Sequence, residues 1–249
     1  RLIKRLRALG MQSFRDYCAL VEGPQGAGER ATMVKALTTN VTRFFREPNH
    51  FEHFRAHVLP GLIAAARRGA RVRVWSAGCS SGEEPYSIAL TILAHMPDAA
   101  RFDIKILASD IDTDVLRLGR AGVYADAATA PIDKEMRQRW LAPGRRAGDE
   151  NNWAVGPELR GLVAFRRLNL VDEWPMKGPF QAIFCRNVLI YFEQETRERI
   201  WRQMADLMAP GGHLYVGHSE RVHGEPMRFT PVAHTIYRLT DARSREEAP

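Results

Sequence analysis

The chain has 249 residues, of which 45% are hydrophobic, enough for one large domain or for a medium domain with a small one. No apolar run reaches the roughly 18–20 residues of a membrane span, and the three cysteines lack the spacing of a zinc site or a disulfide framework. These features exclude a membrane-spanning protein and predict a protein of the reducing cytoplasm that holds no metal. The net charge of +7 favours an anionic partner, such as nucleic acid, anionic lipid or an acidic protein, no more than it favours simple solubility.

An N-terminal helical unit is expected over roughly the first 45 residues, where apolar residues recur at helical spacing. We expect three helices there, in the segments RLIKRLRALG, SFRDYCALVEG and RATMVKALTT. Ser13 is placed to cap the second helix. The first segment carries cations opposite its apolar side, at Arg1, Lys4, Arg5 and Arg7. A further helical stretch, PNHFEHFRAHVLPGLIAAARR, is expected to break at Pro60.

From residue 71 onward, strands and helices alternate. Strands are expected at RVRVWSAG, FDIKILASD, FQAIFCRNVLIYF, HLYVGHS and HTIYRLT. Helices are expected at EEPYSIALTILAHM, at TDVLRLGRAG with Thr113 as its N-cap, and at ETRERIWRQMADLMAPGG, closed by Pro210 and Gly211. This alternation is typical of a doubly wound α/β sheet. Residues 124–165 interrupt it, and we expect an inserted subdomain with short strands there.

The turn after the first of these strands is built from small residues, over positions 77–82. In open α/β sheets, ligands bind beyond the carboxyl ends of the strands, and small residues let a ligand approach the backbone N–H groups at a helix start. A tight turn with no ligand would look the same. The turn is followed at once by Glu83 and Glu84, which would repel a pyrophosphate. We therefore predict a cationic ligand, a sulfonium or an amine.

Polar residues also follow the next strands. Asp110 ends the second strand, where a carboxylate can accept both hydroxyls of a ribose. Its alternative role, capping the following helix, can be supplied by Asp112 or Thr113 instead, so we favour the ribose. Asn169, followed by Leu170, carries an amide that can pair with an adenine edge. Taken alone, a plain turn is the simpler explanation of Asn169.

The strand that begins at Phe180 ends in Arg186 and Asn187. A buried strand ends in such residues only where they meet a ligand, a partner or solvent, and the residues alone do not decide among these. His218, in the segment GHSE, is expected to have a structural hydrogen-bonding role, and Cys79 to be a small residue in a tight turn. No Ser/His/Asp or Cys/His arrangement for nucleophilic catalysis is visible.

The sequence resembles a known family, the chemotaxis receptor methyltransferases, which are protein-glutamate O-methyltransferases usually called CheR. The N-x-T-x-F-F-R and C-S-S-G-E-E-P-Y-S motifs are the most specific, and the order of all matching stretches follows the family. These stretches are RLRALGMQSFRDY, ALTTNVTRFFREPNHF, WSAGCSSGEEPYSIAL, ASDIDTDVLRLGRAGVY, LNLVDEWPMKGPFQAIFCRNVLIYF and APGGHLYVGHSE.

The resemblance implies an N-terminal helical domain with a linker, at 1–47, and a Rossmann-like domain that binds S-adenosylmethionine, at 48–249. It also implies a small antiparallel β-subdomain, inserted at about 124–165, with APGRRAGDENNW as a variable loop. The family's helical domain begins earlier, so part of it is expected to precede this sequence. In some members the subdomain docks a peptide from the receptor's C-terminus, and the sequence leaves open whether it does so here.

The resemblance also assigns residues to the cofactor. In the linker, Asn40, Thr42 and Arg46 are implied to close over it. Glu83 and Asp110 are implied to hold its amino-acid and nucleoside parts. The adenosine and the methyl-transfer pocket are implied to be lined by Asn169, Leu170, Arg186 and Asn187. Arg46 is expected to orient either the incoming carboxylate or the cofactor, and the two roles stay open.

The activity that the resemblance implies is methyl transfer from S-adenosylmethionine to glutamates in acidic cytoplasmic helices of chemoreceptors, which serves sensory adaptation. The products are glutamate methyl esters and S-adenosylhomocysteine. The cationic first helix, with Arg1, Lys4, Arg5 and Arg7, is expected to steer those acidic helices, or else to be a solvated face. Charge reversal at Arg5 and Arg7 is then expected to raise the KM for receptor.

Three other functions compete with this one. A nucleic-acid methyltransferase would need an N-P-P-Y or D-P-P-Y loop where this chain has CRNVLIY. A nicotinamide-dependent oxidoreductase is disfavoured by the paired glutamates and by the absence of G-x-G-x-x-G. A weakly active or inactive member that senses the cofactor or acts as a scaffold stays open as the alternative.

Overall fold

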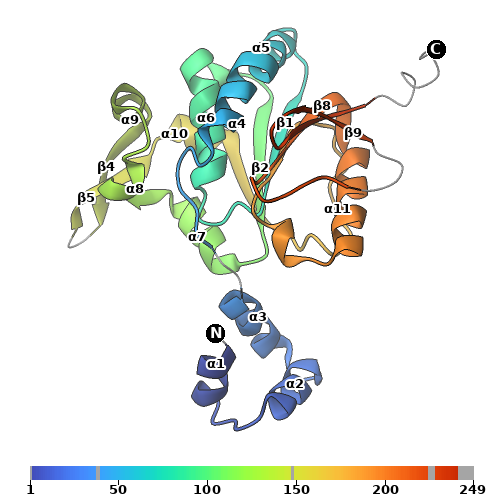
Figure 1. Cartoon of the computed structure of the whole chain (residues 1–249). Coiled ribbons are helices and arrows are strands. Elements are labelled where there is room, and N and C mark those ends of the chain that lie inside the picture. The colour runs from blue at the N-terminus through green and yellow to red at the C-terminus, as the bar shows by residue number, and fades with distance from the viewer. Residues whose placement is uncertain (1, 38–39, 147–148, 224–227, 241–249) are drawn as a thin grey trace, which may run out of the picture. The chain divides into compact units, whose positions relative to one another are not determined.

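The computed structural model describes residues 2–37, 40–146, 149–223 and 228–240. The chain divides into two compact units, Arg1–Val41 and Thr42–Pro249, and we describe each by itself (Figure 1). The helical domain and linker expected at 1–47 therefore extend past the first unit by several residues. Those residues belong to the second unit, in which Phe44 is part of the core and Phe45 packs against it.

The first unit contains three helices in its described part, α1 (Leu2–Ala8), α2 (Phe14–Glu22) and α3 (Ala27–Leu37). The hydroxyl of Ser13 accepts a hydrogen bond from the Asp16 amide at 3.1 Å, which confirms Ser13 as the N-cap of α2. One apolar side chain from α1 and two from α2 form the buried centre of this unit: Leu6, Tyr17 and Val21.

Arg5, one of the four cations expected to steer the receptor, forms an ion pair inside this unit. The guanidinium of Arg5 donates from Nε and Nη2 to the two carboxylate oxygens of Glu29, each at 2.7 Å. The hydroxyl of Tyr17 donates to the same carboxylate at 2.8 Å. The Arg5–Glu29 pair therefore joins α1 to α3, whereas Lys4 and Arg7 are exposed. Arg1 lies outside the described residues.

The second unit is built on a seven-stranded sheet in the order β6-β2-β1-β7-β8-β10-β9. Neighbours from β6 to β8 are parallel, and β10 is antiparallel to both β8 and β9. The strands are β1 (Val72–Ala77), β2 (Ile104–Asp110), β6 (Val163–Arg167), β7 (Phe180–Cys185), β8 (Met208–Val216), β9 (Phe229–Ala233) and β10 (Ile236–Leu239). The chain runs outward from β1 to β6 and then returns to the other side at β7, so the winding reverses between β1 and β7.

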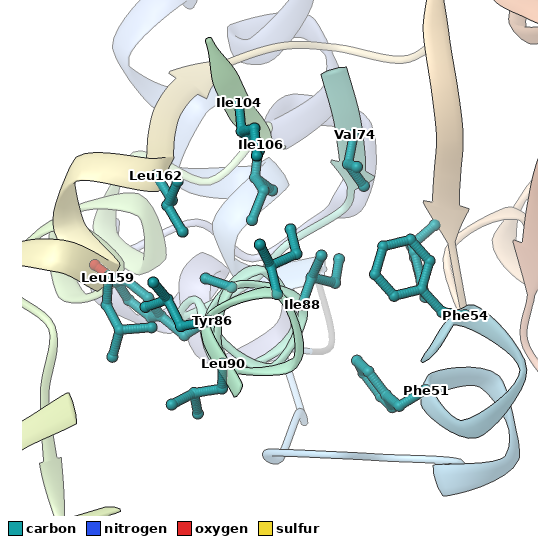
Figure 2. Close-up of a cluster of buried hydrophobic side chains, with 14 of the residues drawn as sticks. Phe51, Phe54, Val74, Tyr86, Ile88, Leu90, Ile104, Ile106, Leu159 and Leu162 are labelled. Carbon is teal, nitrogen blue, oxygen red and sulfur yellow. The ribbon is translucent and has the colours of Figure 1, made fainter. Parts of the chain in front are cut away.

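Helices cover both faces of this sheet (Figure 1). On one face, α6 (Glu83–His95) is almost wholly buried, because its apolar residues surround the helix rather than forming one stripe. Figure 2 shows its Ile88 lying between Val74 and Ile106 of the sheet and the aromatic ring of Phe51. On the other face, α11 (Gln194–Asp206) packs Ile200, Trp201 and Met204 against the strands. The predicted Rossmann-like α/β fold is confirmed.

Two local predictions were wrong at helix ends. The helical stretch that we expected to break at Pro60 continues from α4 (Pro48–His53) through a π-helix (Phe54–Val58) into α5 (Leu59–Arg67). Pro60 lies in the first turn of α5, where a missing N–H costs nothing. The N-cap of α7 (Thr113–Ala121) is Asp112 instead of Thr113, because the Asp112 carboxylate accepts from the amide of Asp114 at 2.8 Å.

The start of β8 also differs from the prediction. The helix α11 ends at Asp206, and Pro210 and Gly211 lie inside β8 instead of closing the helix. The register of β8 against β7 is irregular between Phe180 and Ala182, opposite this Pro-Gly segment. A proline cannot donate to the ladder, so a strand carries it at such an irregularity.

The inserted antiparallel sheet has the order β3-β5-β4, formed by β3 (Val123–Ala125), β5 (Asp149–Val155) and β4 (Leu141–Arg146). Between β3 and β4 lie α8 (Asp126–Thr129) and α9 (Lys134–Trp140). The expected variable loop thus falls largely in β4 and β5. After this sheet, α10 (Pro157–Leu162) leads into β6, which pairs with β2 in the main sheet. The inserted sheet therefore ends earlier than the expected limit of about 165.

A group of histidines packs between the helical stretch and β8. The ring of His50 is fully buried, with Nε2 at 2.8 Å from the hydroxyl of Thr235. The rings of His53 and His213 lie 5.5 Å apart, and His53 Nδ1 is 3.1 Å from the Tyr215 hydroxyl. Burial lowers the pKa of His50 to about 3 and that of His213 to about 4. These imidazoles are therefore neutral in the folded protein near pH 7.

Stability is expected to fall with acid because of these histidines. In the unfolded chain their pKa is about 6.5, so below that pH the unfolded state binds more protons. The free energy of unfolding should drop by about 1.4 kcal/mol per pH unit for each such histidine, from about pH 6.5 until the folded pKa is reached. Urea unfolding of His213→Gln should show a shallower pH slope than wild type and than the exposed control His223→Gln. An unchanged slope for His213→Gln would contradict this account.

Candidate functional site

The candidate site lies at the carboxyl ends of the parallel strands, where the winding reverses. The turn after β1 has left-handed backbone at Gly78 (φ 77°), Ser80 (φ 49°) and Gly82 (φ 99°). A Cβ on Gly78 would come within 2.2 Å of a methyl carbon of Val188, so only glycine fits there. The close packing joins the turn after β1 to the loop after β7.

Asp110 ends β2 directly beside this turn. Its Oδ2 accepts from the Ser80 amide at 2.8 Å, and its Oδ1 accepts from the Asp112 amide at 2.9 Å. Each carboxylate oxygen retains capacity for a further hydrogen bond. Since Asp112 caps α7, Asp110 is not the helix cap. Burial raises the pKa of the Asp110 carboxyl, which means that its charge is poorly solvated.

Glu83, the first residue of α6, is also buried, with only 8% of its surface exposed. Its Oε2 accepts from the Ser81 hydroxyl at 2.7 Å. Burial raises the pKa of the Glu83 carboxyl. In the part of the chain that the structure describes, no ion pair joins Glu83 or Asp110 to a basic side chain. A buried carboxylate without a cation is costly, so these two acceptors fit a ligand that brings positive charge and hydroxyl groups.

Arg186, at the end of β7, is the centre of a buried ion-pair network. Its side chain is only 2% exposed, and it lies 3.2 Å from the carboxylates of both Glu84 and Glu47. It also donates to the backbone carbonyl of Arg46, and its guanidinium lies 5.7 Å from the ring centre of Phe51. Burial alone would raise the pKa of Glu47, but the charge of Arg186 holds it below its usual value. Sequence reasoning missed Glu47.

Glu220 was also missed, and it organises the loop after β7. Within the described residues, its buried carboxylate accepts from four backbone amides: Asn187 at 2.7 Å, Val188 at 3.1 Å, Leu189 at 2.8 Å and Gly217 at 2.6 Å. Asn187 has left-handed backbone, with φ 59°. Glu220 therefore ties the end of β7 to the end of β8 and holds Asn187 in an unfavourable conformation. The only sequence signal is a glutamate shortly after Gly217, which is too common to have identified it.

Replacing Glu220 with glutamine is expected to lower the free energy of unfolding by about 2–3 kcal/mol, because an amide NH₂ would face backbone donors and leave them unpaired. Urea unfolding monitored by circular dichroism measures the loss. The exposed Glu195→Gln on α11 makes the same charge change and should stay within about 0.5 kcal/mol of wild type. Equal stability of the two variants would show that the four amide contacts do not need the carboxylate.

The linker residues lie partly in each unit. Asn40 belongs to the first unit, and Thr42 is half-buried at the start of the second. Phe44 is buried and its ring lies 5.0 Å from that of Tyr124, edge to face. The amide of Phe45 donates to the hydroxyl of Ser87 on α6 at 2.9 Å. The aromatic pair thus anchors the linker on the helix that begins with Glu83.

Asn169 and Leu170 follow β6, next to the end of β2. The amide of Leu168 donates to the carbonyl of Asp110 at 3.0 Å, which brings this segment beside Asp110. The side-chain oxygen of Asn169 accepts from the Val171 amide at 3.3 Å, so Asn169 shapes its own turn. Leu170 is buried in the core on the α11 face. The structure therefore brings Asn169 together with Asp110, while Arg186 and Asn187 lie on the β7 side.

Among the described residues, no group of three or more His, Cys, Asp or Glu side chains is arranged to hold a metal ion. None of the helices within the described ranges is both long and apolar enough to cross a membrane.

Comparison with known proteins identifies a family and its relatives. The family described as "CheR methyltransferase, SAM binding domain" matches residues 40–238. A "Probable chemotaxis protein methyltransferase" of Rhizobium etli is 50% identical over 241 residues, covering 96% of this chain and 90% of its own length. The "Chemotaxis protein methyltransferase" of Escherichia coli is 42% identical over 241 residues, covering 96% of this chain and 81% of its own.

Solved structures are more distant. An S-adenosylmethionine-dependent methyltransferase from Mesorhizobium loti is 18% identical, with a TM-score of 0.33, over 63% of this chain and 51% of that one. The cofactor follows from the family match, and two buried carboxylates with no basic partner among the described residues fit the cationic, ribose-bearing S-adenosylmethionine. The chain belongs to the CheR methyltransferase family, the S-adenosylmethionine-dependent methyltransferases of chemotaxis.

Proposed function

We propose that the protein transfers a methyl group from S-adenosylmethionine to the side-chain carboxylate of glutamates in the cytoplasmic helices of chemoreceptors. The products are glutamate methyl esters and S-adenosylhomocysteine, and the reaction serves sensory adaptation in the cytoplasm. The observation that carries the proposal is the pair of buried carboxylates, Glu83 and Asp110, at neighbouring segments of the site and with no basic partner within the described ranges. Family membership supports the methyl donor and the chemotaxis setting.

Each proposed site residue is assigned to one part of the cofactor. We assign Glu83 to its amino-acid part, through the ammonium group, and Asp110 to the ribose hydroxyls. Asn169 is assigned to the adenine edge, since it lies beside Asp110, and Leu170 to the apolar support beneath it. The other proposed contacts are Asn40, Thr42, Arg46, Arg186 and Asn187.

Arg186 has a more specific role than lining the pocket. Its charge is already shared by Glu84 and Glu47, each at 3.2 Å. It therefore has little charge left to attract an anionic group from outside. We assign Arg186 to holding Glu84 and the linker in place, and Arg46 to orienting either the substrate carboxylate or the cofactor.

The mechanism requires little acid–base chemistry. When bound, S-adenosylmethionine supplies an electrophilic methyl group on a sulfonium. A substrate glutamate, with a pKa of about 4.3, is already ionised near neutral pH, so the chain supplies no general base. Glu83, Asp110 and the linker align the reacting atoms at near contact. Two opposite charges disappear during transfer, so the residues that keep water out favour the reaction.

The experiment uses methyl-labelled S-adenosylmethionine and a cytoplasmic fragment of a chemoreceptor from the same organism. Label should enter the receptor and be released as methanol in mild base, which distinguishes an ester from an N-methyl group. A receptor fragment whose accepting glutamates are replaced by alanine should take up no label. Binding of S-adenosylhomocysteine without any transfer across the organism's receptors would favour the sensing or scaffold alternative, and label in nucleic acid would contradict the proposal.

The first helix is proposed to steer the acidic receptor helices. Arg5 is unsuited to testing this, because it forms the Arg5–Glu29 pair inside the helical unit. We therefore predict that Lys4→Glu with Arg7→Glu raises the KM for receptor about fivefold to tenfold, and more at low salt, with no change in S-adenosylhomocysteine affinity. The same charge change at Arg68 and Arg199 should leave the KM unaltered. Equal kinetics for both double variants would remove α1 from the docking surface.

The inserted sheet offers a second contact with the receptor. Its strands β3, β5 and β4 are held to α8 and α9 by Asp126, whose carboxylate accepts from Trp153 Nε1 at 2.7 Å and from Arg137 at 3.1 Å. The docking of a receptor C-terminal peptide on this sheet stays a prediction. Calorimetry with the last residues of a receptor would test it.

A further inference from the structure

The backbone on both sides of Arg46 is held in an unfavourable conformation. Phe45 has φ 50° and Glu47 has φ 56°, the left-handed region that side chains other than glycine rarely adopt. Such conformations persist only where surrounding contacts enforce them, and they gather at functional sites. The residue between them is the one that we propose to meet the reacting groups.

Contacts from α6 and β7 hold this backbone. The Phe45 amide donates to Ser87 Oγ at 2.9 Å, and the Arg46 carbonyl accepts from the guanidinium of Arg186. The Phe45 ring lies edge to face against the ring of Phe51, with centres 5.2 Å apart. These backbone contacts fix the main chain at residues 45 and 46. Holding the backbone angles of residue 47 requires a contact of its own side chain.

Glu47 supplies that restraint. Its Oε2 lies 3.2 Å from Arg186 Nη2 at the end of β7, and its Oε1 lies 3.3 Å from His218 Nδ1, after β8. The Glu47 carboxylate is also 3.4 Å from Nδ1 of the buried His50. One carboxylate thus connects the linker to two strand ends. Its charge is retained in the folded protein because Arg186 lowers its pKa.

We propose that Glu47 is a positioning residue for methyl transfer: its ion pair with Arg186 locks the left-handed linker and thereby sets the direction of the Arg46 side chain. The inference rests on the proposed function, in which Arg46 orients the substrate carboxylate or the cofactor. It also explains why Arg186 is flanked by two carboxylates. Glu84 belongs to α6 and holds Arg186 to that helix, whereas the ion pair of Glu47 with Arg186 holds the linker in place.

The test compares Glu47→Gln, Glu47→Asp and Glu47→Gly in the full chain. Glu47→Gln should fold, because Arg186 keeps its ion pair with Glu84. We expect kcat for receptor methylation to fall by about tenfold to a hundredfold, since small misplacements of an orienting group cost that much. The KM for receptor and the affinity for S-adenosylhomocysteine should change by less than about twofold. Glu47→Asp keeps the charge and should recover most of the loss.

Glu47→Gly separates charge from backbone strain. Glycine adopts the left-handed conformation readily, so wild-type kcat in this variant would show that backbone shape alone positions Arg46 and would overturn the inference. A fall at least as large as that of Glu47→Gln is expected. The exposed Glu52→Gln, on the same helical stretch, makes the same charge change as Glu47→Gln and should leave kcat at the wild-type value.

A second readout needs no substrate. Hydrogen exchange at the Phe45 amide, which is bonded to Ser87, should be at least about tenfold faster in Glu47→Gln than in Glu52→Gln, because the linker opens more often. Unchanged exchange together with unchanged kcat would overturn the inference. If the wild-type protein methylates no receptor glutamate, the proposed function fails, and the exchange rate alone then decides whether Glu47 locks the linker.

Discussion

An Arg186→Met variant is expected to lose about 3–5 kcal/mol of its free energy of unfolding and all detectable methyl transfer. Removing the guanidinium leaves the carboxylate of Glu84 buried, with the hydroxyl of Ser76 at 2.7 Å as its remaining donor among the described contacts. Glu47 also loses its main cation. A buried charge left without its partner costs far more than the intact pair contributes.

Urea unfolding of Arg186→Met against wild type measures this loss. Adding Glu84→Gln should return part of the stability, because a neutral amide tolerates burial better than an unpaired carboxylate. In the single variant, the pKa of Glu84 should rise further above its unfolded value. The deficit should then be largest well above the unfolded pKa of about 4.3, and it should shrink as the carboxylate is protonated in acid. A loss below about 1 kcal/mol would contradict the ion-pair network.

A Glu83→Gln/Asp110→Asn variant is expected to bind S-adenosylhomocysteine at least about a hundredfold more weakly than wild type. Each charged hydrogen bond to a ligand contributes about 1.5–3 kcal/mol, and the double variant removes the charge from two of its proposed acceptors. The amides keep the size of the side chains, but at position 110 the new NH₂ faces the backbone N–H of Ser80 or Asp112. The single Glu83→Gln variant, in which no other residue's backbone donor faces the new amide in the described contacts, should therefore also bind more weakly, by about tenfold or more. The Ser81 hydroxyl, which donates to Glu83 in the wild type, can still donate to the oxygen of the new amide.

Calorimetric titration measures this affinity, with circular dichroism as the check that the variant is folded. The double control Glu52→Gln/Glu195→Gln changes the net charge equally but lies on exposed helical surfaces. Its affinity should match wild type. Should the two double variants bind equally well, the pair of buried carboxylates is not the cofactor site, and the proposed function loses the observation that carries it.

The parts of the site that could be predicted are those with a local signal. Asp110 ends a largely apolar strand, and Glu83 follows the small-residue turn after another. Glu47 and Glu220 have no such signal. Arg186 meets Glu84 over 102 positions of sequence and the Arg46 carbonyl over 140. Contacts between residues so far apart in sequence depend on which strands become neighbours, and no local sequence pattern encodes that.

The fold shows the same limit. The alternation of strands and helices predicted the main sheet, because apolar runs and turn residues are local. Pro210 and Gly211 were interpreted as the end of a helix, since they usually are, yet they lie inside β8, in the irregular stretch between the partners of Phe180 and Ala182. Likewise β6 was assigned to the insertion, and only its parallel pairing with β2 shows that it completes the main sheet. Tertiary pairing overrode local preference in both cases.

The position of β7 between β1 and β8 has a consequence for the newly made chain. Glu47 and Glu84 are synthesised long before Arg186, and neither can form its ion pair with Arg186 until β7 docks beside β1. Bringing segments together over 100 residues or more costs loop-closure entropy that nearby contacts do not incur. We therefore expect the centre of the sheet to be completed late in folding, and a nascent chain that stops before β7 carries its carboxylates without the arginine that pairs with them.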